Sequence, residues 1–157
     1  MPRSVPRRFA CRHAHWAWLL GSIAAAASLA RADTKTAVEV SVTQARNSDG
    51  HVLACLFSSA SGFPGEPERA VAQAQSRIQN GKARLSFPPV PPGTYAVSVI
   101  HDENDNRKLD TNLVGIPKEG IGASNNPEPR FGPPKYDQAK FRVGAEPVRQ
   151  RVRLRYF

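Results

Sequence analysis

Short stretches in which apolar and polar residues alternate recur along this chain, and turns rich in Gly and Pro separate them. In residues 36–45, Val38, Val40 and Val42 alternate with small or polar residues. A period of two places every second side chain on the same face of a strand, so this pattern predicts strands with one buried face. Little of the chain favours helix. The sequence therefore predicts an all-β fold.

The turns between these stretches indicate how the strands connect. Asn80-Gly81 is the strongest short signal for a β-hairpin and joins two predicted strands. Residues 88–92 are rich in proline, which lacks an N–H donor, so we expect a connection there rather than a paired strand. These features predict an antiparallel β-sandwich of about seven strands. The predicted strands are residues 36–45, 51–58, 71–79, 82–87, 94–100, 139–143 and 148–157.

The first 32 residues have the composition of a secretory signal peptide. A basic start precedes an apolar, Ala-rich run over residues 16–29, and Ala30-Arg31-Ala32 supplies the small residues of a cleavage site. The run is shorter than the ~20 residues that cross a bilayer, so we expect cleavage and no transmembrane segment in the mature chain. The prediction is a single exported domain, residues 33–157, in the periplasm or outside the cell.

Cleavage would change the charge and the cysteine content. The chain has 22 basic and 13 acidic residues, and five of the basic ones precede residue 33. The mature charge is then 17 − 13 = +4, and nucleic acid is not an expected partner of such an exported domain. Cys55 would be the one remaining cysteine, so no internal disulfide forms. Its apolar neighbours predict a buried, unreactive thiol.

An acidic stretch over residues 101–110 follows the strand of residues 94–100. Its oxygen-bearing side chains have the spacing of the first part of an EF-hand calcium loop, but Arg107 replaces the turn glycine and Leu113 replaces the final glutamate. Two interpretations stay open, a loop that holds Ca²⁺ and a solvated turn whose Asn and Asp side chains cap their own backbone. The candidate metal ligands are Asp102, Asn104, Asn106, Lys108 (through its carbonyl) and Asp110.

Residues 102–137 form a long segment without a regular period, and residues 111–137 contain five prolines. A loop of this length is either functional or disordered. Its apolar residues favour an ordered, Pro/Gly-rich flap that packs on the sandwich. These residues are Leu113, Val114, Ile116, Ile121, Phe131 and Tyr136.

His101 and Asp102 are the residues that best suit acid–base catalysis. A neighbouring carboxylate raises the pKa of a histidine, which is a common general base. The chain has no nucleophile elbow, zinc motif or phosphate-binding loop, so we expect no enzyme. The alternative is a small periplasmic hydrolase with His101 and Asp102 at the mouth of the flap.

The last predicted strand carries a row of arginines. Period two places Arg149, Arg151, Arg153 and Arg155 on one face of the strand. Such a ridge could bind an anionic surface, including an anionic component of the cell envelope. Charge on a strand also protects a sheet edge from aggregation, and that interpretation stays open.

Several motifs resemble a family of secreted bacterial proteins, domain-of-unknown-function family 2141. They are Pro91-Pro92-Gly93-Thr94-Tyr95 before a strand, then HDENDNRKLDTN, GIPKEGIGASNN and FGPPKYDQAKF. The resemblance implies a prealbumin-like, carboxypeptidase-regulatory-like or immunoglobulin-like sandwich and no established activity. Family members typically have glycine where this chain has Asp105 or Arg107. We expect an exported binding or scaffolding module whose ligand the sequence does not name.

Overall fold

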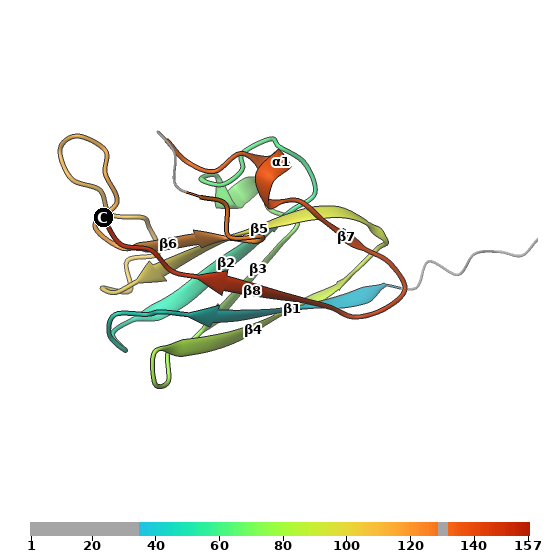
Figure 1. Ribbon diagram of the computed structural model, residues 1–157, viewed down its shortest axis with the longest axis horizontal. Helices are drawn as coiled ribbons and strands as arrows, with labels where there is room; N and C mark the ends of the chain where they lie inside the picture. The colour runs from blue at the N-terminus through green and yellow to red at the C-terminus, as the bar shows by residue number, and fades with distance from the viewer. Residues whose placement is uncertain (1–34, 129–131) are drawn as a thin grey trace, which may run out of the picture. The chain divides into compact units, whose positions relative to one another are not determined.

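Two β-sheets pack face to face in the computed structural model, which describes residues 35–128 and 132–157 (Figure 1). The predicted signal peptide, residues 1–32, lies outside the described residues. The strands are β1 (Thr36–Thr43), β2 (His51–Phe57), β3 (Ala72–Ser76), β4 (Lys82–Val90), β5 (Gly93–Asp102), β6 (Gly120–Ala123), β7 (Phe141–Val143) and β8 (Val148–Arg153). Two short helical turns are η1 (Pro67–Arg69) and α1 (Tyr136–Ala139).

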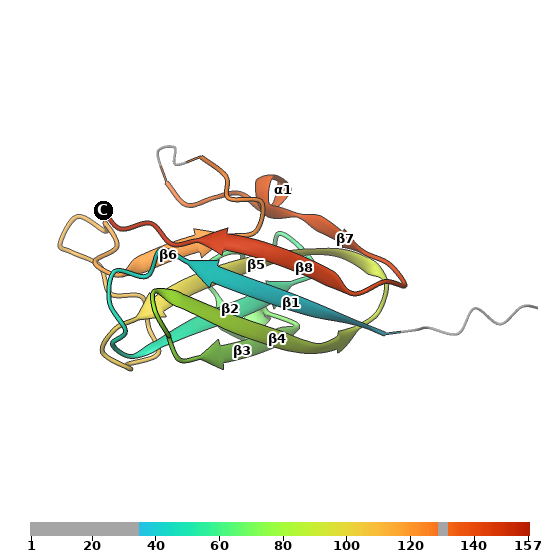
Figure 2. The ribbon, with the colours of Figure 1, turned by 60° about the horizontal axis from the view of Figure 1, so that its bottom comes forward.

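The smaller sheet has three strands in the order β4-β1-β8 (Figure 2). Strand β1 lies in the middle, antiparallel to β4 and parallel to β8. The larger sheet has five strands, in the order β3-β2-β5-β6, and β7 pairs with the first residues of β5. The predicted antiparallel β-sandwich is confirmed, with one parallel pair of strands in the smaller sheet.

The core lies between the inner faces of the two sheets. Val38, Val40 and Val42 of β1 are at most 1% exposed, as their alternation predicts. Burying each such side chain contributes about 1.5–3 kcal/mol relative to exposure, so the alternating pattern determines which face of each sheet is inside. The inner residues of β2 and β5 that meet them are Val52, Ala54, Leu56, Val97 and Val99.

The Asn-Gly turn forms as predicted, but its two strands belong to different sheets. Asn80 and Gly81 both have positive φ, 52° and 71°, as a tight two-residue turn requires. Gln79 and Lys82 exchange backbone hydrogen bonds of 2.8 and 3.1 Å. Beyond this bridge, β3 pairs with β2 and β4 pairs with β1. The turn is therefore a corner between the sheets rather than the end of a long hairpin.

The proline-rich connection is shorter than expected because β4 includes Pro88 and Pro89 and continues to Val90. Val90 pairs with Thr36 after an irregularity in the register of β1. Strand β4 is at the edge of its sheet, where a residue without an N–H donor can be accommodated.

The predicted flap contributes regular structure to the larger sheet. Residues 120–123 form β6 and pair with β5, which the sequence did not predict. Farther on, the buried Ser124 hydroxyl donates to the Ala139 carbonyl at 2.6 Å and accepts from the Val97 N–H at 2.9 Å. Tyr136 of α1 packs with Phe63 against a small cluster of alanines. Residues 120–124 are thus fixed to β5, and so is α1, since the Tyr136 hydroxyl donates to the Thr94 carbonyl at 2.9 Å.

Candidate functional site

The acidic loop, residues 102–110, is organised around a buried carboxylate. Asp102 is 1% exposed and lies at the end of β5. Its two oxygens accept the backbone N–H groups of Asn106 at 3.1 Å and Arg107 at 2.8 Å. The carboxylate at the start of the loop therefore caps the backbone of the same loop.

A second carboxylate, that of Asp110, collects the side chains of the loop. It accepts the amide groups of Asn104 at 2.7 Å and Asn106 at 3.1 Å. The carbonyl oxygens of these two amides accept backbone N–H groups two residues farther on. These are the self-capping turns of the solvated-turn interpretation.

Two residues of the acidic loop have the backbone conformation that favours glycine. Asp105 has φ 57° and Arg107 has φ 61°. A residue with a side chain in this left-handed region costs about 1–2 kcal/mol. These are the positions at which the resemblance implies glycine, so the loop has the backbone shape that glycine would favour despite the different residues.

The candidate calcium ligands thus lie in one loop, and their carboxylates already accept hydrogen bonds. Within residues 35–128 and 132–157, no group of three or more His, Cys, Asp and Glu side chains is placed to hold a metal ion. The asparagine side chains and the Lys108 carbonyl are further candidate ligands that do not belong to these four residue types. The calcium site at Asp102, Asn104, Asn106, Lys108 and Asp110 stays a prediction.

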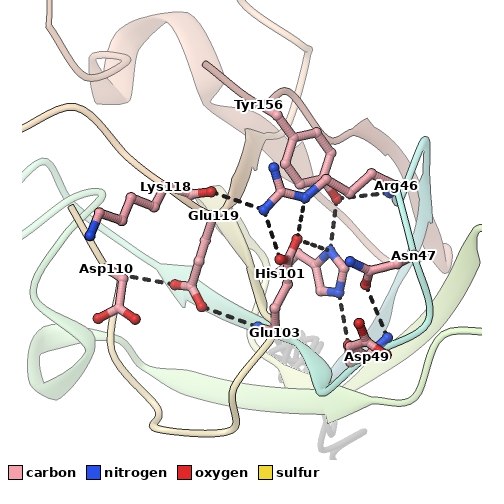
Figure 3. A network of polar contacts seen from close by, with 9 residues as sticks. All are labelled: Arg46, Asn47, Asp49, His101, Glu103, Asp110, Lys118, Glu119 and Tyr156. Atoms are coloured by element: carbon pink, nitrogen blue, oxygen red, sulfur yellow. Dashed lines mark hydrogen bonds and ion pairs between the residues drawn. The ribbon is translucent and has the colours of Figure 1, made fainter. Parts of the chain in front are cut away.

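His101 and Asp102 point to opposite sides of β5, because neighbouring residues of a strand alternate. His101 is 0% exposed, and its Nδ1 lies 2.7 Å from the Tyr156 hydroxyl while its Nε2 lies 2.9 Å from the Asp49 carbonyl (Figure 3). The Asp49 carbonyl can only accept, so Nε2 donates to it, while Nδ1 shares its hydrogen bond with the Tyr156 hydroxyl. Both ring nitrogens of His101 therefore have hydrogen-bond partners, and its side chain and that of Asp102 lie on opposite faces of the strand.

Arg46 joins this buried histidine to the loops around it. Its guanidinium makes two hydrogen bonds of 2.7 Å with the Glu103 carboxylate and one of 3.2 Å with the Lys118 carbonyl (Figure 3). It also lies over the Tyr156 ring, 4.6 Å from the centroid. The hydrogen bond from Arg46 holds the pKa of Glu103 below its ordinary value, and the same pairing raises the pKa of Arg46.

Glu119 completes this polar network from the other side. Its carboxylate is 4% exposed and accepts the backbone N–H groups of Glu103 at 3.1 Å and Asp110 at 3.0 Å (Figure 3). It therefore ties the start of the acidic loop to its end. Together, the network fixes both ends of the segment that follows, residues 110–118.

This segment, the apolar hairpin, protrudes from the sandwich beside the C-terminus in both ribbon views (Figures 1 and 2). The Asp110 carbonyl accepts the Lys118 N–H at 2.8 Å, and the Ile116 carbonyl accepts the Asn112 N–H at 2.9 Å. The side-chain oxygen of Asn112 accepts the N–H groups of Val114 at 3.0 Å and Ile116 at 2.9 Å. The hairpin is thus ordered by its own hydrogen bonds.

The side chains of the apolar hairpin face solvent, contrary to the expectation that they pack on the sandwich. Leu113 is 107% exposed, Val114 78% and Ile116 45%. The hydrogen bonds of Asn112 and of the hairpin backbone hold this segment away from the sheets, so its apolar residues have no core to join. Phe131, also expected to be buried, lies outside the described residues. The sequence did not predict this hairpin. The signal that could have indicated it is Leu-Val-Gly between Asn112 and Ile116, a turn with apolar residues at its tip.

The outer face of the larger sheet has a shallow groove of about 330 Å³. Leu53, Cys55 and Ile100 form part of its lining, and Arg107 of the acidic loop stands at one side. The apolar neighbours of Cys55 predicted a buried thiol, but Cys55 is half-buried on this outer face and is not part of the core. Burial raises the pKa of its thiol to about 11, which agrees with an unreactive cysteine.

The arginine row occupies the outer face of β8 only in part. Arg149, Arg151 and Arg153 are exposed on the smaller sheet. Arg155 follows the end of β8 and exchanges two backbone hydrogen bonds of 2.9 Å with Ile121 of β6. The row therefore continues from the smaller sheet to the junction with the larger one.

No helix in the described residues is both long and apolar enough to cross a bilayer. Comparison with other proteins finds no match among curated proteins and none among solved structures. One protein family does match, over residues 40–151, and it is described as uncharacterized protein conserved in bacteria. Since this range covers most of the sandwich, the chain belongs to that family, DUF2141.

Proposed function

We propose that this protein is an exported binding module that attaches to a lipid surface through the apolar hairpin, and that it does not catalyse a reaction. The observation that carries this proposal is the high exposure of Leu113 and Val114 on an ordered hairpin. Large apolar side chains gathered on a surface mark an interaction site. The polar network holds the hairpin in one shape, so little ordering is needed on binding.

Most of the exposed large apolar side chains of the described residues belong to this end of the molecule. Leu109, 36% exposed, precedes the hairpin, and Phe157, 64% exposed, follows Tyr156. Tyr156 packs against Gly120 directly after the hairpin, since a Cβ at Gly120 would lie 2.5 Å from its ring. Five apolar side chains at one end would bury enough surface for reversible attachment to a bilayer interface.

The charges near the hairpin favour lipid head groups over an isolated apolar pocket. Lys108 and Lys118 flank the hairpin and are exposed. Of the acidic residues of the same region, Asp102 and Glu119 are buried and Glu103 binds Arg46. The Asp105 carboxylate contacts His51, and the Asp110 carboxylate accepts the amide groups of Asn104 and Asn106. Lysine side chains can reach phosphate groups while the tip enters the interface.

Vesicle sedimentation tests this function with phosphatidylcholine vesicles, alone and mixed with phosphatidylglycerol. The protein is purified as bacteria export it, and its intact mass should correspond to residues 33–157. We expect the double variant Leu113→Asp/Val114→Asp to bind at least about tenfold more weakly, because it loses two inserted side chains. Val71→Asp is the matched control, since Val71 is 51% exposed next to η1, away from the hairpin, and should leave binding unchanged.

Three results would contradict the proposal. Absence of binding to either vesicle would exclude a lipid surface and leave a protein pocket as the partner of the hairpin. Equal binding by the wild type and the double aspartate variant would show that the hairpin does not take part. A purified protein that keeps residues 1–32 would overturn the proposed export.

A further inference from the structure

The outer face of the smaller sheet brings together cations from two strands that are distant in the sequence. In the register of the sheet, Ser41 of β1 lies between Arg84 of β4 and Arg151 of β8. Thr43 lies in the same way between Lys82 and Arg153. A third row has Glu39 between Ser86 and Arg149. The basic face is defined by these three rows.

The charge of the basic face is mostly not neutralised by neighbouring groups. Arg149 forms an ion pair of 2.9 Å with Glu39, the one acidic residue of the three rows. In the part of the chain that the structure describes, no ion pair joins Lys82, Arg84, Arg151 or Arg153 to an acidic side chain. Four cations without an ion-pair partner therefore lie on the outer face of the smaller sheet.

The unpaired cations of the basic face stand in two lines, one on β4 and one on β8. The strip over β1 between these lines is called the trough. Along each strand, residues of one face repeat every ~7 Å. Neighbouring strands are ~4.8 Å apart, so the line of cations on β4 and the line on β8 stand ~10 Å apart. Between them β1 presents only the hydroxyl groups of Ser41 and Thr43 beyond Glu39. A linear polyanion fits between two such lines, with its charges on the arginines and lysine and its hydroxyls on β1.

Protection of the sheet edge does not account for the charges on β8. The free edge of β8 is already covered by Asn126, whose amide donates to the Arg151 carbonyl at 2.7 Å and whose side-chain oxygen accepts the Arg153 N–H at 2.7 Å. The arginines of β8 are exposed on the outer face of the sheet. Four cations on one face repel one another, which is unfavourable for folding. We therefore expect an anionic partner that offsets this repulsion.

The residues of the basic face discriminate between polyanions. Its three rows contain no aromatic side chain, whereas single-stranded nucleic acids are usually held by stacking on aromatic rings. They contain no large apolar residue to enter a bilayer, and the exposed ones in the described residues lie elsewhere. Hydroxyl groups between cations suit a sugar chain that bears carboxylate or sulfate groups.

We propose that the basic face binds a linear anionic polysaccharide in the trough over β1. This site is separate from the apolar hairpin, since the two surfaces share no residue. Attachment to a lipid surface and binding of a polysaccharide chain can therefore be lost independently.

Binding to polygalacturonate and to heparin, measured by calorimetry over a range of salt concentrations, tests this inference. The variant Arg84→Gln/Arg151→Gln should bind about tenfold more weakly than the wild type and show a shallower salt dependence. Arg77→Gln/Arg142→Gln removes the same charge from exposed arginines outside the trough and should keep nearly full affinity. The hairpin variant Leu113→Asp/Val114→Asp should also bind the polysaccharides like the wild type.

Several outcomes would overturn the inference. Equal losses in the two arginine variants would mean that net charge, not the trough, determines binding. Failure of the wild type to bind either polysaccharide would exclude the proposed ligand class. Tighter binding of single-stranded DNA or of phosphatidylglycerol vesicles, lost in Arg84→Gln/Arg151→Gln, would assign the face to another polyanion. Circular dichroism of each variant checks that all of them are folded.

Discussion

Arg46 and Glu103 form the charged contact beneath the apolar hairpin, and this contact makes stability depend on pH. The folded-state pKa of Glu103 is below its ordinary value of 4.5 because Arg46 binds the carboxylate. A lowered pKa means that the contact stabilises the fold fully above pH 4.5 and that this contribution is lost as the pH falls through the folded-state value.

Urea unfolding followed by circular dichroism at a series of pH values measures this effect. We expect the wild type to be more stable than Glu103→Gln near neutral pH, and the difference to shrink below pH 4.5. Arg46→Gln removes the cause of the shift and should show the same reduced pH dependence. A constant difference between the wild type and Glu103→Gln across this range would refute the assignment.

Sequence reasoning at this scale found the polar residues but not their partners. It placed His101 at a strand end beside an acidic loop, which is correct. The series of contacts from Arg46 through Tyr156 to His101 was not predictable, because His101 and Tyr156 are 55 positions apart and meet only in the folded chain. The positive φ of Asp105 and Arg107 could be suspected only from the glycines that the resemblance implies there.

Among the elements, the apolar hairpin has one side chain, that of Asn112, that accepts two of its backbone N–H groups. The Asn112 oxygen accepts the N–H groups of Val114 and Ile116 inside the hairpin. Without this acceptor, both groups open to water more often, while the sandwich loses no packing contact. Asn112→Ala should therefore loosen the hairpin without unfolding the domain.

Amide hydrogen exchange at Val114 and Ile116 checks this prediction. We expect exchange to be about tenfold faster in Asn112→Ala, which corresponds to the loss of roughly one hydrogen bond of 1–1.5 kcal/mol. Asn112→Asp keeps an acceptor oxygen and should retain protection. Unchanged exchange in Asn112→Ala would mean that the backbone bonds alone hold the hairpin.

The elements themselves were predictable where alternation and burial coincide. The valines of β1 and the run of β2 predicted buried strands because their apolar faces meet the core. Strand β6 was missed because its four residues, Gly120–Ala123, include two glycines and show no alternation. Its place is determined by pairing with β5, a tertiary contact. The partners of β3 and β4 were also misjudged, since the Asn-Gly turn determines the local bend and not the sheet of each strand.

For the whole molecule, the two sheets are joined along one side by Asn126, which follows β6 of the larger sheet and bonds to β8 of the smaller one. Sequence analysis predicted two packed sheets but not how they close. Asn126 has φ 49°, so Asn126→Gly preserves the backbone conformation and removes both hydrogen bonds. Asn126→Asp keeps the acceptor for the Arg153 N–H and removes only the donor to the Arg151 carbonyl.

Chemical unfolding followed by far-UV circular dichroism tests this junction. We expect Asn126→Gly to reduce the free energy of unfolding by about 1–3 kcal/mol, since each lost bond contributes about 1 kcal/mol and β8 keeps unpaired groups at its edge. Asn126→Asp should cost roughly half as much. If Asn126→Gly is no less stable than Asn126→Asp, the Arg153 bond does not join the sheets. The backbone pair of Ile121 and Arg155 would then still link the two sheets.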